Sequence, residues 1–201
     1  MTCIVGYIEK KEKETVIYLG GDSAGVAGTH ITLREDPKVF KKTGENGTFL
    51  IGFTSSFRMG QLLMSSKFEP PKQKENQTDL DYMITDFVDE VRKVFDKNGY
   101  MKKESGQEEG GTFIVAYKDK LYQIESDFQV GVNLAPYDAC GSGEDYAKGA
   151  LYSLVNFSSI KDGKKIVEKA LEISANFNAG VSKPFNIVKL IYKNHENKKT
   201  K

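Results

Sequence analysis

The sequence contains no tryptophan, two cysteines, two histidines and five prolines in 201 residues. Two cysteines, Cys3 and Cys140, cannot make a disulfide framework, and their spacing fits no zinc motif. They are typical of small core side chains in a reducing compartment. His30 and His195 have no serine, cysteine or aspartate placed beside them as in a histidine-dependent triad. These absences argue against a secreted disulfide scaffold, a zinc protein and a histidine-based hydrolase.

Long apolar runs and net charge are also missing. No stretch approaches the roughly 20 apolar residues of a membrane span. The apolar start has no basic region before it and runs into Glu9-Lys10-Lys11, so we predict no signal peptide and expect a cytoplasmic protein. Lys and Arg total 29 against 28 Asp and Glu, a net charge of +1. This balance argues against nucleic-acid or anionic-membrane partners.

The sequence does contain enough apolar material for one sizeable core. Hydrophobic residues make up 39% and charged residues 28% of the chain. We predict a single domain over residues 1–193, followed by a charged tail over residues 194–201.

Apolar periodicity predicts strands first, then two helices, then strands, two helices and a last strand. The expected strands are 2–8, 15–19, 31–33, 39–40, 48–54, 113–117, 121–125, 128–132, one closing at 139–140, and 187–192. The expected helices are 57–68, 78–97, 145–155 and 162–178, and the segments 69–77 and 100–111 are expected to be loops. Segregated runs of this kind indicate an α+β fold with two stacked, mainly antiparallel sheets and helix pairs outside.

The first residues are the most informative for chemistry. Thr2 follows the initiator methionine and is small enough for Met1 to be removed. Without Met1, Thr2 would carry both a hydroxyl and a free α-amine, whose ordinary pKa is roughly 7.7–8.0. Such an amine can serve as the base for its own hydroxyl. Taken alone, Thr2 is better explained as the start of a strand.

An N-terminal nucleophile also needs a cation near its hydroxyl, a group that holds this cation, and donors for the developing oxyanion. The sequence offers candidates for these roles: Asp22 after a glycine pair, Lys38 before a short strand, the turn at residues 52–56, and Ser142 between two glycines. Taken singly, Asp22 and Ser142 are typical turn residues and Lys38 a typical surface lysine. Cys3, which is not terminal, is better explained as core than as a nucleophile.

The sequence resembles the proteasome β-subunit family, and most closely its bacterial HslV (ClpQ) branch. The resemblance is collinear from Thr2 to about Leu190 and rests on Thr2-Cys3-Ile4-Val5, Gly20-Gly21-Asp22-Ser23, Lys38, Ile51-Gly52-Phe53-Thr54-Ser55-Ser56, the stretch from Cys140 to Ala147, and Lys169-Ala170-Leu171-Glu172-Ile173. Lys38 follows Asp22 at the spacing expected for the active-site lysine of the family. The resemblance implies the four-layer αββα sandwich of N-terminal nucleophile hydrolases.

The resemblance also implies roles for single residues. Thr2 would be the nucleophile, Lys38 would lower the pKa of its hydroxyl, Asp22 would orient Lys38, and Ser142 would bind near the terminal amine. The backbone N–H of Ser55 would meet the oxyanion, although the family has glycine at this position, which makes a narrower pocket or lower activity plausible.

Two further features follow from the resemblance. The second acidic residue of the proteasome branch falls on Asn178, and its partner serine on Val181. In HslV, carbonyls of this loop bind a sodium ion, which here would place Na⁺ or Mg²⁺ near the carbonyls of Ala175, Asn178 and Val181. No other cofactor is expected.

The implied function is a threonine endopeptidase that degrades unfolded polypeptides inside a homo-oligomeric ring. A separate ATP-dependent unfoldase would deliver the substrate, because the chain has no Walker-type ATP loop. Two alternatives stay open. One is a catalytically inactive, ring-forming subunit that keeps Met1, and the other is an N-terminal amidohydrolase that acts on a small amide.

Overall fold

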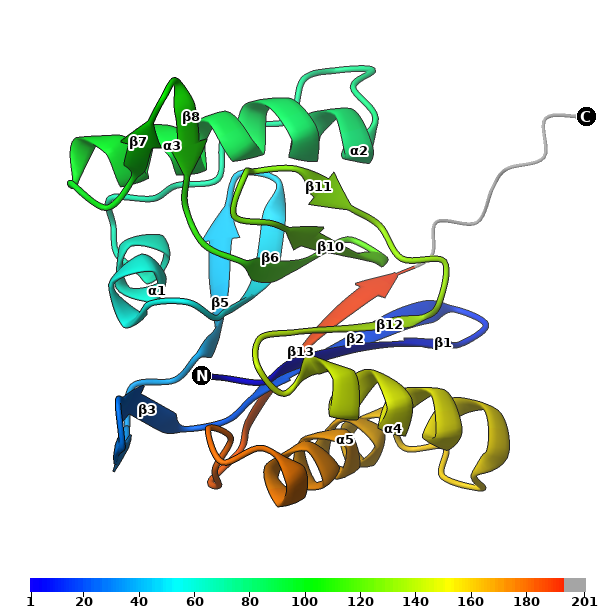
Figure 1. The fold of residues 1–201 in the computed structure, drawn as a ribbon. Helices are drawn as coiled ribbons and strands as arrows, with labels where there is room; N and C mark the ends of the chain where they lie inside the picture. The colour runs from blue at the N-terminus through cyan, green and yellow to red at the C-terminus, as the bar shows by residue number, and fades with distance from the viewer. Residues whose placement is uncertain (194–201) are drawn as a thin grey trace, which may run out of the picture.

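The computed structural model describes residues 1–193 and shows two antiparallel sheets stacked face to face (Figure 1). The first sheet has the strand order β12 (Tyr137–Cys140), β1 (Ile4–Lys10), β2 (Glu14–Gly21) and β13 (Asn186–Lys193). The second has the order β11 (Val130–Gly131), β10 (Lys120–Ile124), β9 (Phe113–Tyr117), β6 (Gly47–Phe53) and β5 (Val39–Gly44). The predicted tail, residues 194–201, lies outside the described residues.

Helices cover the outer faces of both sheets (Figure 1). The second sheet is covered by α1 (Phe57–Met64), α2 (Asp79–Tyr82), a π-helical turn (Met83–Phe87) and α3 (Val88–Lys97). The first sheet is covered by α4 (Glu144–Phe157) and α5 (Gly163–Phe177). The predicted four-layer αββα sandwich is therefore confirmed.

Local sequence signals set the beginnings of the helices. The side chains of Ser56, Thr78 and Asp162 accept backbone N–H bonds and cap α1, α2 and α5, and all three are residue types favoured at this position. The predicted helix 78–97 is one helical stretch interrupted by the π-helical turn. Within this stretch the Thr85 hydroxyl donates to the Asp81 carbonyl at 2.6 Å, a side-chain bond that competes with regular helix bonding.

The prediction of a loop over residues 100–111 is wrong. The structure has a hairpin of β7 (Lys102–Glu104) and β8 (Gln107–Glu109) there. Its turn places Ser105 and Gly106 at positive φ, which matches the twist of a tight hairpin. The two strands are almost entirely charged or polar, so they show no apolar alternation from which they could be predicted.

A second hairpin is only half predicted. Strand β4 (His30–Leu33) contains the expected strand 31–33, but its partner β3 (Ala24–Ala27) was not predicted. The hairpin projects at the edge of the sandwich where the chain begins (Figure 1). It follows Asp22 directly and therefore borders the candidate site described below.

Three buried clusters hold the layers together. One lies between the two sheets, and the other two lie between each sheet and its helices. The sheets approach closely at Gly52, where an added Cβ would lie 2.7 Å from the Ile4 side chain. This close packing fixes the ends of β1, β2 and β5 relative to one another. Within residues 1–193, no helix combines the length and apolar character needed to cross a membrane.

Tyr117 and Tyr122 are both buried between the second sheet and its helices, and they allow a matched test of the cost of burying a hydroxyl. The Tyr117 hydroxyl donates to Gln73 Oε1 at 2.7 Å, whereas the Tyr122 hydroxyl has no hydrogen-bond partner among the described residues. We expect Tyr117→Phe to lower the free energy of unfolding by about 1 kcal/mol and Tyr122→Phe to leave it unchanged or raise it. Urea denaturation measures both, and equal losses in the two variants would contradict this reading.

Candidate active site

The candidate site lies where the strand ends of the two sheets meet. Thr2 precedes β1, and Asp22 follows β2. Since Ile4 pairs with Gly21 across these two strands, the residues just beyond the pair, Cys3 and Asp22, also lie side by side. Lys38 immediately precedes β5 of the other sheet and approaches from the opposite layer. The N-terminal segment enters between the two layers (Figure 1).

Lys38 contacts both Thr2 and Asp22. Its Nζ lies 3.0 Å from Thr2 Oγ1 and 2.8 Å from Asp22 Oδ1. The side chains of Lys38 and Asp22 are 1% and 0% exposed. An ion pair at this depth is only weakly screened, so the ammonium acts strongly on the adjacent hydroxyl.

Asp22 is held by the backbone as well as by Lys38. Its Oδ1 accepts the N–H of Cys3 at 3.0 Å, and its Oδ2 accepts the N–H of Ala24 at 2.9 Å and that of Ser182 at 3.4 Å. A buried carboxylate is costly unless its lone pairs are used. Together with Lys38 Nζ, these three N–H groups give the Asp22 carboxylate four donors that fix its position. The carboxylate in turn fixes the lysine.

Burial lowers the pKa of Lys38 below its ordinary value, and the charge of Asp22 opposes this shift in part. The folded chain therefore binds fewer protons than the unfolded chain between the lowered pKa and the ordinary one. In that window the free energy of unfolding rises with pH. The ammonium is thus closer to releasing its proton than a surface lysine.

The turn at Ser142 holds the backbone of Thr2. The Thr2 N–H donates to Ser142 Oγ at 3.1 Å, and the N–H of Gly143 donates to the Thr2 carbonyl at 3.2 Å. Gly141 has a φ of +99°, and a Cβ on it would lie 2.4 Å from the Thr2 carbonyl oxygen. Glycine at position 141 is what allows the turn to approach Thr2 so closely.

The end of α5 holds this turn through two side chains spaced four residues apart. Ser174 Oγ donates to the Gly143 carbonyl at 3.0 Å, and Asn178 Nδ2 donates to the Ser142 carbonyl at 2.6 Å. Ser174 is fully buried and was not predicted as part of the site. A serine on the buried face of a predicted helix is the signal that could have identified it.

Met1 is joined to Thr2, the candidate nucleophile, and blocks its α-amine. The Thr2 hydroxyl donates to the Met1 carbonyl at 2.6 Å, and the Thr2 nitrogen is an amide of the Met1–Thr2 peptide bond. An amide nitrogen is no proton acceptor. The chemistry expected for Thr2 therefore requires removal of Met1.

Ser55 lies at the turn into α1 with a φ of +59°, in the left-handed region that favours glycine. Its Oγ accepts the N–H of Thr112 at 3.2 Å and lies 3.2 Å from the Thr54 hydroxyl. Ser55 and Thr2 line the same small cavity. The turn thus keeps the backbone shape expected at the glycine position, and these side-chain bonds help to stabilise it.

The two thiols do not share this chemistry. Burial raises the pKa of Cys3 to about 12 and that of Cys140 well above its usual range. The thiolate is the reactive form, so neither cysteine is a nucleophile at neutral pH. Their placement matches the expected role as core side chains.

The carbonyls of Ala175, Asn178 and Val181, where the resemblance places a cation, are neutral oxygens. The carbonyl of Asn178 already accepts the N–H of Val181 at 3.1 Å, and Ala175 lies within α5. Among residues 1–193, no group of three histidine, cysteine or acidic side chains could hold a metal. A donor set without carboxylate suits Na⁺ better than Mg²⁺. The sodium ion remains a prediction, and no step proposed below depends on it.

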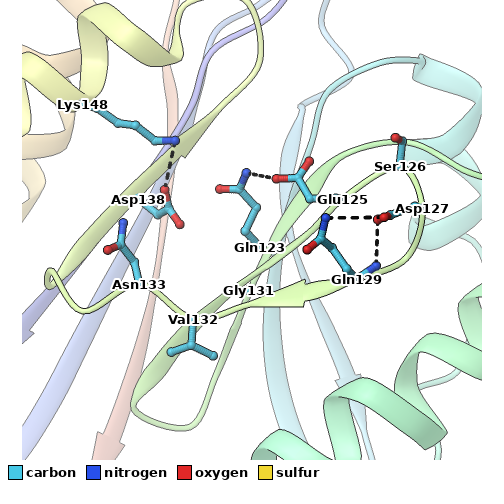
Figure 2. Close-up of a pocket in the computed structure, with 10 residues that line it drawn as sticks. All are labelled: Gln123, Glu125, Ser126, Asp127, Gln129, Gly131, Val132, Asn133, Asp138 and Lys148. Atoms are coloured by element: carbon cyan, nitrogen blue, oxygen red, sulfur yellow. Dashed lines mark hydrogen bonds and ion pairs between the residues drawn. The ribbon is translucent and has the colours of Figure 1, made fainter.

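A hollow of about 520 Å³, lined by residues shown in Figure 2, includes none of the candidate residues above. It is bordered by β10, β11, β12 and α4, and its charged lining residues are Glu125, Asp127, Asp138 and Lys148. Lys148 lies 3.6 Å from Asp138. The hollow contains none of the residues that contact Thr2, so size alone does not identify the site here.

Comparison with solved structures identifies the same fold in proteasome-like subunits. BPH from Thiobacillus denitrificans superposes with a TM-score of 0.69 at 16% identity, over 94% of this chain and 97% of that chain. The eukaryotic HslV from Trypanosoma brucei gives 0.63 at 18% identity, over 96% and 100%. Anbu, described as an ancestral beta-subunit, from Yersinia bercovieri gives 0.67 at 14% identity, over 98% and 88%.

These structures confirm the predicted resemblance at the level of the fold, which is that of the N-terminal nucleophile hydrolases. No protein-family model and no curated protein sequence matches the chain. At 14–18% identity, the likeness carries the fold alone. The roles of Thr2, Asp22, Lys38 and Ser142 therefore rest on their geometry.

The buried ion pair of Lys38 and Asp22 gives a stability prediction. We expect Asp22→Ala to lower the free energy of unfolding by about 3–5 kcal/mol, because it leaves the Lys38 ammonium buried and unpaired and removes three backbone bonds. Glu90→Ala, which breaks an exposed pair with Lys93, should cost no more than about 1 kcal/mol. Urea denaturation of both variants measures the difference, and a loss below 1 kcal/mol for Asp22→Ala would contradict the role of this pair.

Proposed function

We propose that the protein is a threonine-type peptidase of the proteasome/HslV kind, active once Met1 is removed. The observation that carries the proposal is the contact between Lys38 Nζ and Thr2 Oγ1 at 3.0 Å, with Asp22 on the other side of the ammonium. The buried ammonium of Lys38 lies against a hydroxyl at the head of the chain. It favours the alkoxide form of that hydroxyl.

In the proposed reaction, the free amine of Thr2 takes the proton of its own hydroxyl, and Oγ1 attacks the carbonyl carbon of the scissile peptide bond. The backbone N–H of Ser55 stabilises the oxyanion. The amine then returns the proton to the leaving nitrogen as the C–N bond breaks. Water hydrolyses the ester on Thr2 and regenerates the hydroxyl. Lys38 keeps its charge throughout, and Asp22 keeps Lys38 in place.

The proposal extends to assembly and substrate. The structural neighbours include a helical assembly of the Anbu complex from Pseudomonas aeruginosa, with a TM-score of 0.63 at 15% identity over 99% of this chain and 88% of that chain. By analogy, we expect this chain to form a homo-oligomer, in a ring that encloses the sites. Unfolded polypeptide delivered by a separate ATP-dependent unfoldase is the expected substrate, and the cytoplasm the expected location.

A second candidate function follows from Met1 itself. While Met1 remains, its carbonyl accepts the Thr2 hydroxyl and the Thr2 nitrogen is an amide. A chain that keeps Met1 would be a structural, catalytically inactive subunit with the same fold. The mass of the purified protein separates the two candidates, because only the proposed peptidase begins at Thr2. Hydrolysis of a small amide but of no peptide would instead indicate an amidohydrolase.

The nucleophile can be tested by substitution. We expect Thr2→Ala to reduce hydrolysis of fluorogenic peptides at least 1,000-fold, about 4 kcal/mol of transition-state stabilisation, because no hydroxyl remains to form the ester. Thr2→Ser should retain activity, and Thr43→Ala, which removes an exposed hydroxyl on β5, should leave the rate unchanged. Undiminished hydrolysis by Thr2→Ala would exclude Thr2 as nucleophile.

The lowered pKa of Lys38 gives a pH prediction. We expect kcat/KM to rise as the Thr2 amine loses its proton and to fall again as Lys38 loses its own. The falling limb should lie below pH 10.5, the ordinary lysine value, because burial lowers the pKa of Lys38. In Lys38→Arg the charge persists, so the falling limb should move to higher pH. A wild-type profile still level at pH 10.5 would contradict the assigned role of Lys38.

A further inference from the structure

The Lys38 ammonium has a third neighbour besides Thr2 and Asp22. Its Nζ lies 5.6 Å from the centroid of the Phe57 ring, within the range of a cation–π contact. A lysine ammonium has three N–H donors, and among the described residues its hydrogen-bond acceptors are Thr2 Oγ1 and Asp22 Oδ1 alone. The Phe57 ring is therefore what the ammonium faces beyond these two oxygens.

The same ring lies against a second cation. The Cζ atom of Arg34 is 3.9 Å from the centroid of Phe57. Phe57 stands at the first position of α1, is only partly buried, and contacts Phe53 edge to face with 5.7 Å between the ring centroids. The position of this ring, and with it the contact to Lys38, therefore depends on Arg34 as well as on Phe53.

Arg34 is itself held in place. Its Nε and Nη2 donate to the two carboxylate oxygens of Asp36 at 2.8 and 2.6 Å, a two-point contact that fixes the plane of the guanidinium. The backbone N–H of Arg34 donates to the Ser23 carbonyl at 2.9 Å. Its side chain lies over Gly25 of β3, where an added Cβ would be 2.8 Å from Arg34 Cδ. The β3–β4 hairpin that follows Asp22 thus carries the guanidinium to the site.

The charges around Lys38 give Arg34 an electrostatic effect as well. Burial is the main cause of the lowered pKa of Lys38; Asp22 opposes this shift, and the positive charge of Arg34 adds to it. The thiol of Cys3 also faces Lys38, but its pKa of about 12 keeps it neutral at neutral pH. Among the described residues, Arg34 makes no hydrogen bond to Thr2 or Asp22, so its action on the site passes through Lys38 and Phe57.

We propose that Arg34 is a positioning residue of the site: held by Asp36, it keeps the Phe57 ring against the Lys38 ammonium, and the ring keeps the ammonium directed at Thr2. This inference rests on the proposed function, because it gives Arg34 a part in the same reaction. Arg34 touches none of the reacting atoms. Its loss should therefore change kcat and the pH dependence of the reaction and leave KM unchanged.

The test compares Arg34→Met with the wild type, both as chains that begin at Thr2, in a pH profile of fluorogenic peptide hydrolysis. Methionine keeps an unbranched stem over Gly25 and removes the charge and the planar group. We expect kcat to fall at least about 3-fold at unchanged KM, because the ammonium is less well directed. The falling limb should move up by about 0.5 pH unit, because a repelling charge is lost and Lys38 becomes better hydrated.

Two further variants test how the effect is transmitted. Asp36→Asn should lower kcat on its own and have no additional effect in Arg34→Met, because Asp36 acts through Arg34. Arg92→Met, which removes an arginine paired with Glu108 outside the site, should change neither kcat nor the falling limb. Additive losses from Asp36→Asn and Arg34→Met would contradict the proposed contacts. Should Arg34→Met fail to fold, Arg34→Gln must show the same fall in kcat and the same shift.

A readout that needs no hydrolysis separates this inference from the proposed function. NMR of protein labelled with ¹³C at lysine Cε follows the titration of Lys38 directly, and Lys38→Met identifies its signal. We expect Lys38 to titrate at higher pH in Arg34→Met than in the wild type and to be unchanged in Arg92→Met. An unmoved titration, or a loss of kcat that is equal at every pH, would overturn the role of Arg34.

The remaining outcome concerns the proposed function itself. A moved Lys38 titration without any Thr2-dependent hydrolysis would refute the proposed function, and with it the part of Arg34 in that reaction. The same result would confirm that Arg34 acts on Lys38. A moved titration together with a lower kcat and a shifted falling limb supports both the proposed function and the positioning role of Arg34.

Discussion

The buried contact between the Lys38 ammonium and the Asp22 carboxylate is the interaction on which the rest of the site depends. Two opposite charges at 1% and 0% exposure are costly to place in a core, and a fold retains them only if the surroundings satisfy them. Three backbone N–H groups complete the shell of Asp22. The lysine is thereby directed at Thr2, and both sheets contribute to its position.

The four-layer architecture explains why such a contact is possible. Adjacent strands β1 and β2 place Thr2 and Asp22 at the same end of the first sheet, and Lys38 lies just before β5 of the facing sheet. Helix α5 then acts from outside through Ser174 and Asn178, which hold the turn that binds the Thr2 backbone. Asn178 has a defined part in this arrangement, because its Nδ2 donates to the Ser142 carbonyl.

The apolar periodicity of the sequence was sufficient to predict two stacked sheets with helices outside, because it is a local signal. That Asp22, Lys38 and Ser142 belong beside Thr2 was expected only from the resemblance to the proteasome β-subunit family. The periodicity was not sufficient for β7 and β8, whose charged strands lack apolar alternation, or for β3, whose four residues Ala-Gly-Val-Ala give little indication of a strand. The contact distances of Lys38 depend on how two sheets pack, and no local pattern encodes that. Ser174 was missed because its role depends on a turn more than 30 residues away in sequence.

The account depends most directly on Thr2 being the group that attacks the substrate. The decisive measurement is mass-spectrometric mapping of the adduct formed when the chain that begins at Thr2 is incubated with a peptide carrying a carboxyl-terminal electrophile. The account predicts one adduct, on Thr2, that forms far more slowly in Lys38→Met. An adduct on another residue, or equal labelling of Thr2 in Lys38→Met, would contradict it.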